Sequence, residues 1–379
     1  MINGKRIVDE FLHLVCIDSE SLNEKEIADY LAKKLKELGL DVWVDNGGGK
    51  FKGNAGNVMG RLKGNVKGEP LLFIAHMDTV KPGNGVKPII ENGVIKSDGN
   101  TILGSDDKSG IVVILEILRI LKKDNIPHPE IEILFTFAEE IGLYGAKTVD
   151  TNRLHSKCGF ALDSEEIENI IIKAPFQNSI KIDIYGIESH AGVVPEKGIS
   201  AIEVAAEAIN NMKLGRIDSE TTANVGIIEG GKAANIVAGH VKLICEARSH
   251  NVDKLEKQTK HMIDAVNNVV RNSEININKK KLIAKSNETV IREFDGISVD
   301  KDEFPAILAY KAIEKTGLKP RFEQSGGGSD ANILNGKGIK TVILGTGMSN
   351  VHTKEEFIKV KNLIKTAEIV GNIIRLSYE

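Results

Sequence analysis

The sequence contains little cysteine, and this scarcity limits the kinds of site that the protein can build. Its three cysteines, Cys16, Cys158 and Cys245, are odd in number, far apart and outside any C-x-x-C motif. This pattern predicts reduced, buried thiols and excludes a disulfide framework or a thiolate zinc site. Any metal ion must therefore be bound through oxygen and nitrogen ligands.

The sequence also lacks an excess of charge and a long apolar run. Lys and Arg number 50 against 53 Asp and Glu, a formal net charge of -3, which is too balanced for a protein that neutralises nucleic-acid phosphates. No stretch reaches the roughly 18 apolar residues of a spanning helix, and the charged N-terminal region contains no signal-peptide core. We therefore expect a cytoplasmic protein with no nucleic-acid or membrane partner.

Several catalytic motifs are missing. The sequence has no H-E-x-x-H, no G-x-S-x-G, no G-x-x-x-x-G-K-[ST] and no G-x-G-x-x-G after a strand. A dinucleotide-dependent enzyme is disfavoured for the last reason. What is left is chemistry based on carboxylates and histidines.

The composition and length favour a globular protein of about two domains. Hydrophobic residues make up 41% and charged residues 27% of 379 residues, with only 9 Pro, so disorder, collagen and coiled coil are disfavoured. Near the N-terminus, Ser21 and Glu24 match a capping box before an amphipathic run at 27–38, and Gly39 follows as a C-cap. These features predict a helix.

Charged residues follow three predicted strands. The apolar run 71–75 precedes His76 and Asp78, the run 131–137 precedes Glu139 and Glu140, and the run 159–162 precedes Asp163. A further pair, Asp106 and Asp107, comes just before the helical pattern 111–121. In open α/β sheets functional groups gather beyond the carboxyl ends of strands, so these side chains are expected to form one site.

Each of these residues, taken alone, also has an ordinary structural explanation. Adjacent carboxylates are usually a solvated surface, Asp163 could be a helix N-cap, and lone histidines such as His190 and His352 are more often surface residues. Burial of unpaired charge at strand ends is costly, however, and a divalent cation removes that cost. Their positions at strand ends therefore favour metal ligation over a role as ordinary surface charges.

The middle of the chain has a different order of elements. Residues 179–185, 224–229, 241–248 and 274–284 are predicted strands, and 200–212 and 252–270 are predicted helices. This β-α-β-β-α-β order is typical of a ferredoxin-like fold. We expect a lid or dimerisation domain at 176–290, inserted into a catalytic α/β domain formed by 1–175 and 291–379.

The motifs resemble, in their order, the M20 family of di-zinc peptidases and amidohydrolases. The likeness spans essentially the whole chain and rests on the segments 76–80, 104–110, 138–142, 189–192 and on Asp163 and His352. The runs 98–104 and 140–147 are most similar to the peptidase T group of tripeptide aminopeptidases. The resemblance implies a discontinuous zinc-peptidase domain with a mixed central sheet and an inserted α+β lid.

The resemblance also implies roles for individual residues. Asp106 would bridge two Zn²⁺, Co²⁺ or Mn²⁺ ions, with His76 and Asp163 on one ion and Glu140 and His352 on the other. Glu139 would act as general base on a metal-bridging water, and Asp78 would hold the His76 ring. In the lid, His190 would stabilise the oxyanion, within its own chain or in a partner subunit, while Asn235 and Arg248 would grip substrate. A cis peptide bond is implied between Asp106 and Asp107.

The predicted function is that of a two-metal aminopeptidase acting on short peptides such as tripeptides. One alternative is an N-acyl-amino-acid deacylase or a carboxypeptidase, which would use the same metal ions but different pockets. A second alternative is a non-catalytic metal- or peptide-binding protein. A homodimer formed through the lid domain is also expected.

Overall fold

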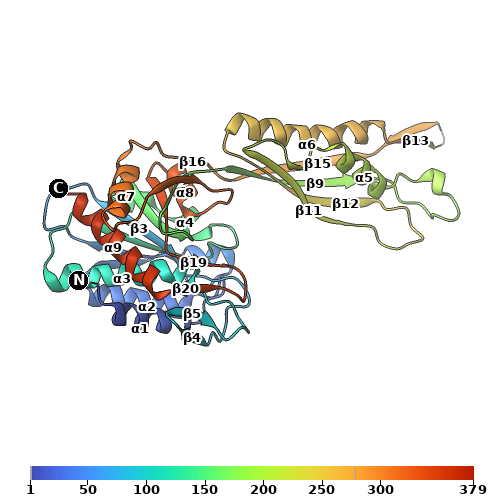
Figure 1. Ribbon diagram of the computed structural model, residues 1–379. Helices are drawn as coiled ribbons and strands as arrows, with labels where there is room; N and C mark the ends of the chain where they lie inside the picture. Colours follow the sequence, from blue (N-terminus) through green and yellow to red (C-terminus); the bar gives the residue numbers. More distant parts are fainter. Residues whose placement is uncertain (1, 278) are drawn as a thin grey trace. The chain divides into compact units, whose positions relative to one another are not determined.

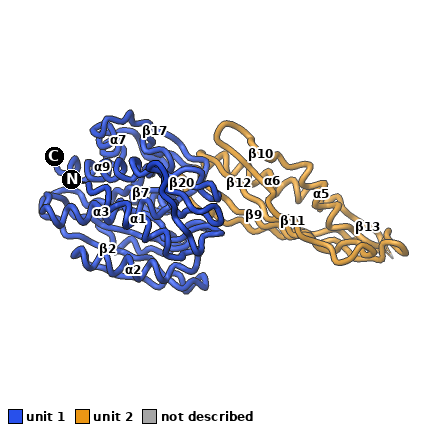
Figure 2. Tube along the Cα trace, turned by 60° about the horizontal axis from the view of Figure 1, so that its bottom comes forward, with its two compact units in different colours: residues 1–174, 297–379 blue, residues 175–296 orange. Residues whose placement is uncertain are grey.

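The computed structural model describes residues 2–277 and 279–379, which form two compact units (Figures 1 and 2). The first unit runs to Ala174 and resumes at Ile297, and the second unit is Pro175–Gly296. Each unit contains its own cluster of buried hydrophobic side chains.

The first unit is built on a mixed nine-stranded sheet. Its strands, in order across the sheet, are β1 (Asp41–Val44), β2 (Val58–Leu62), β6 (Ile131–Thr136), β3 (Leu71–His76), β7 (Cys158–Ser164), β18 (Lys340–Gly345), β8 (Asn169–Ala174) and β16 (Ile297–Ser298), with β17 (Arg321–Gln324) beside β8. A smaller sheet contains β19 (Met348–Ser349), β20 (Phe357–Lys359), β5 (Val94–Ser97) and β4 (Pro88–Glu91).

The centre of the large sheet is parallel and fully covered. Strand β3 pairs in parallel with β6 and β7, and every residue of β3 and β6 is buried. Continuous apolar runs are typical of strands covered on both faces, and each fully buried Leu or Ile contributes about 1.5–3 kcal/mol. The predictions for these two strands are confirmed.

Helices pack around this sheet (Figure 1). They are α1 (Gly4–Val15), α2 (Lys25–Glu37), α3 (Ser105–Asp124), α4 (Tyr144–Thr148), α7 (Phe304–Glu314), α8 (Asp330–Gly336) and α9 (Val360–Leu376). Helix α3 packs against β3 and β7 and also contacts α1 and α9. Gly110 permits this close approach, because a Cβ there would lie 2.8 Å from the Leu162 carbonyl oxygen. The first turn of α3 is thereby placed beside the end of β7.

The second unit has the predicted ferredoxin-like order. It contains β9 (Phe176–Tyr185), α5 (Ala201–Asn211), β10 (Gly215–Arg216), β11 (Thr221–Gly230), β12 (His240–Ser249), α6 (Val252–Asn272), β13 (Glu274–Ile277), β14 (Lys280–Ile283) and β15 (Lys285–Phe294). The sheet order is β10-β11-β12-β9-β15. The single strand predicted at 274–284 is wrong, because β13 and β14 pair with each other and β15 takes the place beside β9.

The N-terminal region corrects another prediction. Helix α2 begins at Lys25, and Glu24 occupies its N-cap position without a side-chain capping bond. The Lys25 amide instead donates to Asn54 Oδ1 at 3.0 Å. Ser21 and Glu24 therefore form no capping box, whereas Gly39 does adopt a left-handed conformation after the helix, with φ +91°.

Candidate active site

Three parallel strands bring their functional residues to one edge of the sheet. His76 is the last residue of β3 and pairs with Thr136, the last residue of β6. Glu139 and Glu140 follow β6, and Asp163 lies near the end of β7. Asp163 is part of that strand, so its interpretation as a helix N-cap is wrong.

Two loops complete the site. Asp106 lies at the start of α3, and the peptide bond between Asp106 and Asp107 is cis, as the resemblance implies. His352 follows β19 with a left-handed backbone, φ +63°. A pocket of about 280 Å³ is lined by His76, Asp106, Glu139, Glu140, Asp163, Ser164, Glu165, Ile171, Ser325, Gly328, Ser329, Ile343, Met348, Val351 and His352.

Asp106 lies between the two histidines. Its Oδ1 is 2.9 Å from His76 Nε2, and its Oδ2 is 3.1 Å from His352 Nε2. The same His352 nitrogen lies 3.0 Å from Glu140 Oε1, and His76 Nε2 lies 3.9 Å from Asp163 Oδ1. Each histidine thus faces Asp106 and one further carboxylate, which is the arrangement that a carboxylate shared by two metal ions requires.

The electrostatics of this cluster fit divalent cations. Burial raises the pKa of Asp163 to about 8, and the neighbouring charge of Asp106 adds to the shift. Burial also raises the pKa of Glu139 and of Glu140. For Asp106, burial opposes ionisation, but hydrogen bonds with His352 and His76 outweigh it and lower the pKa. Crowded carboxylates disfavour one another's charge, and bound divalent ions remove that penalty.

The two adjacent glutamates have different surroundings. Glu140 reaches His352 through Oε1. Glu139 is 9% exposed and lines the pocket, and no partner in the described part of the chain forms a hydrogen bond or ion pair with its carboxylate. A carboxylate with no partner at the edge of a pocket is available to accept a proton.

The Asp78 carboxylate has a position that the sequence did not indicate. His76 Nδ1 is hydrogen-bonded to the Asp78 backbone oxygen at 2.9 Å, whereas the nearest Asp78 carboxylate oxygen is 3.4 Å away. That carboxylate also accepts from the Glu139 amide at 2.9 Å and the Glu140 amide at 3.3 Å. Ser21 Oγ also donates to it, at 2.6 Å. Asp78 therefore holds the backbone of the glutamate pair.

Glu356, which is 1% exposed, supports the site and was not predicted from the sequence. Its Oε2 accepts from the amides of Leu103 and Gly104, at 2.8 and 2.9 Å. Its Oε1 accepts from Ser105 Oγ at 2.6 Å and from the Asp106 amide at 3.1 Å. Glu356 lies four residues after His352, so it ties the His352 loop to the Asp106 loop. No local pattern marks it, because its partners are distant in sequence.

Two more buried carboxylates lie near the cluster. Asp107 accepts from the Gly110 amide at 3.1 Å and from the His76 amide at 3.3 Å, so it holds backbone on both sides. Asp330, 3% exposed at the start of α8, accepts a hydrogen bond from Thr136 Oγ1. The glycine run before Asp330 was the only sequence signal for this residue.

We expect Glu356→Gln to weaken metal binding. One carboxylate oxygen becomes an amide N–H₂ that faces N–H and O–H donors, so about half of the bonds that hold the Asp106 loop are lost. Partners that orient metal ligands typically contribute about 10–100-fold in affinity. Competition with a chromophoric chelator would measure the affinity.

The exposed neighbour Glu355 provides a matched control, since Glu355→Gln changes the same charge without touching the loop. Equal metal affinity in both variants and the wild type would show that Glu356 does not support the site.

The residues predicted to bind substrate all lie in the second unit. His190 Nδ1 accepts from the Gly192 amide at 3.2 Å, and the Ala191 amide donates to the Asn235 backbone oxygen at 3.0 Å. The segments of His190 and Asn235 are therefore adjacent. Arg248, on β12, pairs with Glu246 at 3.1 Å.

The three cysteines partly match the prediction of reduced, buried thiols. All three cysteines are free; Cys158 and Cys245 are buried as predicted, but Cys16 is exposed.

Among the residues that the structure describes, no helix combines the length and apolar composition that crossing a bilayer needs. A further histidine–carboxylate group, Glu130, Glu132 and His155, lies outside the pocket, and there Glu132 pairs with Arg61.

The chain is similar to known proteins over most of its length. The model of "Peptidase family M20/M25/M40" matches residues 72–376. The crystal structure of aminopeptidase PepT from Bacillus cereus is 43% identical, with a TM-score of 0.91 and full coverage of both chains. A tripeptidase from Staphylococcus aureus is 39% identical, with a TM-score of 0.93 over 100% of this chain and 99% of that chain. The uncharacterized protein YqjE of Bacillus subtilis is 43% identical over 99% of each chain.

The fold and the match define the class of protein as a metallopeptidase. The chain belongs to peptidase family M20/M25/M40.

Proposed function

We propose that this peptidase is a two-metal aminopeptidase that releases N-terminal residues from short peptides. The observation that carries the proposal is the position of Asp106, whose two oxygens face different histidines at 2.9 and 3.1 Å. The aminopeptidase PepT of Bacillus cereus and the tripeptidase of Staphylococcus aureus, each similar to this chain over nearly its whole length, support the substrate class.

The cluster and the family resemblance together support one set of metal ligands. His76 and Asp163 would hold one ion, Glu140 and His352 the other, and Asp106 would join them. This donor set of nitrogen and oxygen suits Zn²⁺, Co²⁺ or Mn²⁺. Two such ions, when bound, would supply Lewis-acid activation of the attacking water and of the scissile carbonyl.

The side chains around the cluster would move the proton. Glu139 takes a proton from the attacking water and passes it to the leaving amine, because its carboxylate lines the pocket and has no partner among the described residues. Asp78 accepts a hydrogen bond from the Glu139 amide and so fixes the backbone at Glu139. The base and the ligand are thus adjacent residues with separate tasks.

The second unit would complete substrate recognition, and this part rests on the family resemblance. His190 would donate to the developing oxyanion, and Asn235 would contact the peptide. Arg248 would bind a free α-carboxylate through its planar guanidinium, which suits short substrates. The same unit would form a homodimer.

A substrate panel tests the proposal. Free tripeptides, N-acetylated tripeptides and N-acyl amino acids would be incubated with the metal-loaded protein, with and without a chelator, and products identified by mass spectrometry. We expect release of the N-terminal residue from free tripeptides only, lost with chelator and restored by metal. Cleavage of the N-blocked substrates alone would identify a deacylase, release of the C-terminal residue a carboxypeptidase, and no cleavage a binding protein.

A further inference from the structure

The segment between α1 and α2 contacts the turn that carries Glu139. Within this segment Glu24 is fully buried, with 0% of its surface exposed. Its Oε1 accepts from the Leu22 amide at 2.8 Å and from the Ala138 amide at 2.9 Å. A buried carboxylate more than a hundred residues away in sequence is therefore bonded to the residue just before Glu139.

The turn itself is held at three consecutive amides. Glu24 accepts from Ala138, and Asp78 accepts from Glu139 and Glu140. Ala138 has a left-handed backbone, φ +47°, which residues other than glycine rarely adopt. Such a conformation persists only where its surroundings hold it. Here two carboxylates from other segments hold the amides, and the Tyr144 amide donates to the Ala138 backbone oxygen at 3.1 Å.

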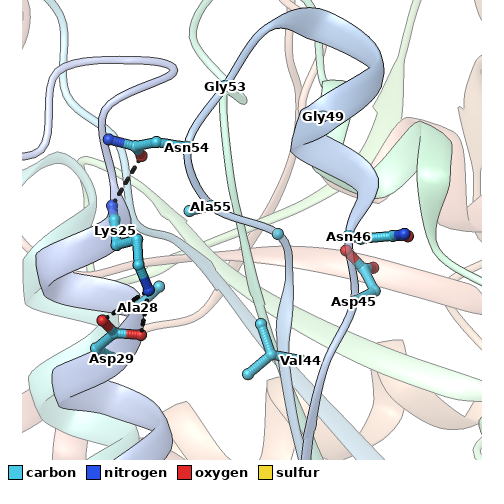
Figure 3. Close-up of a pocket in the computed structure, with 11 residues that line it drawn as sticks. Lys25, Ala28, Asp29, Val44, Asp45, Asn46, Gly49, Gly53, Asn54 and Ala55 are labelled. Atoms are coloured by element: carbon cyan, nitrogen blue, oxygen red, sulfur yellow. Dashed lines mark hydrogen bonds and ion pairs between the residues drawn. The ribbon is translucent and has the colours of Figure 1, made fainter.

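Hydrogen bonds from the residues on either side of Glu24 to other segments fix its position. The Lys25 amide donates to Asn54 Oδ1 at 3.0 Å, a bond drawn in Figure 3, which shows a separate pocket lined by Lys25 and Asn54 and not the candidate active site. The Asn54 amide in turn donates to the Leu22 backbone oxygen at 3.1 Å. The Ser21 amide donates to the Thr79 backbone oxygen at 3.2 Å, so the segment is held on both sides of Glu24.

We propose that Glu24 is a positioning residue for catalysis: through the Ala138 amide it sets the backbone that aims the Glu139 carboxylate. This inference rests on the proposed function of Glu139 as general base. A buried N–H without an acceptor is costly, so loss of the Glu24 oxygen would let the turn reorganise. A general base must lie within hydrogen-bond reach of its proton, and a misplacement of about 1 Å can cost about 100-fold in rate.

Three substitutions of Glu24 separate position from mere packing. Glu24→Gln keeps an oxygen at the Oε1 position, and its amide nitrogen replaces Oε2, which has no hydrogen-bond partner among the described residues. Glu24→Asp keeps the charge but withdraws the oxygen by one methylene, and Glu24→Leu removes the acceptor at similar volume. Glu26→Leu, on the exposed side of α2, is the control for charge loss.

We expect kcat on the same tripeptide to fall about 10–100-fold in Glu24→Leu, less in Glu24→Asp, and only a few-fold in Glu24→Gln. KM and metal content should stay near wild type, because the Glu140 amide keeps its bond to Asp78. In a Glu139→Gln background, Glu24→Leu should cause no further loss, since residues that act as a unit are not additive. If Glu24→Leu does not fold, a comparison of kcat between Glu24→Asp and Glu24→Gln tests the same inference.

Wild-type kcat in Glu24→Leu, or in Glu24→Asp if only that variant folds, would overturn the inference, as would loss of metal in step with activity. If Glu139→Gln itself kept full kcat, the proposed base would be wrong instead. The two failures are therefore distinguishable.

Discussion

Glu139→Gln is expected to lower kcat about 10²–10⁴-fold while the protein keeps both metal ions. This range is the usual contribution of a general acid–base residue. The substitution preserves shape and removes only the ability to take a proton. Among the described residues, no hydrogen bond or ion pair joins the Glu139 carboxylate to either histidine of the cluster. Steady-state kinetics on a tripeptide and metal analysis of the same sample would measure both quantities.

The adjacent residue provides the matched control. Glu140→Gln makes the same chemical change one position along the chain, but Glu140 faces His352. We expect this variant to lose affinity for one ion. If Glu139→Gln loses metal and Glu140→Gln does not, the assignment of base and ligand is reversed.

Asp106→Asn is expected to abolish binding of both ions and to reduce activity by at least about 10³-fold. Each oxygen of Asp106 faces a different histidine, so one substitution removes charge from both positions. Lewis-acid activation contributes several kcal/mol, and each 1.36 kcal/mol is a factor of ten in rate. Metal titration by calorimetry would show the loss.

The exposed Asp98 serves as the control, because it lies on the preceding loop and its carboxylate accepts hydrogen bonds from Asn100 of its own turn. An Asp106→Asn variant that bound one ion with unchanged affinity would show that Asp106 is not shared.

Much of the site could be predicted because its residues follow strong local signals. The apolar runs of β3 and β6 fixed where each strand ends, and parallel pairing then brought His76 and Glu139 to the same edge. The order of motifs supplied the rest, including His352, which no local pattern distinguishes from a surface histidine.

The residues that hold the site could not be predicted in this way. Ser21 and Glu24 match a capping box, yet their side chains form stronger tertiary contacts, with Asp78 and with the Ala138 amide. A buried charge-assisted hydrogen bond outweighs a helix cap. Glu356 likewise has its partners about 250 residues away in the chain.

The strand predicted at 274–284 failed for a different reason. Strands β13 and β14 are largely exposed, so alternation along them reports no buried face and cannot specify a partner. Strand β15, which does complete the sheet, was not predicted because most of its residues are exposed and give no clear apolar pattern.

Metal content of the purified wild-type chain tests the central claim most directly. X-ray fluorescence or mass spectrometry should find two divalent ions per chain, with peptidase activity that disappears on chelation and returns in proportion to metal added back. One ion per chain at full activity, or undiminished activity in a metal-free sample, would contradict the two-metal site around Asp106.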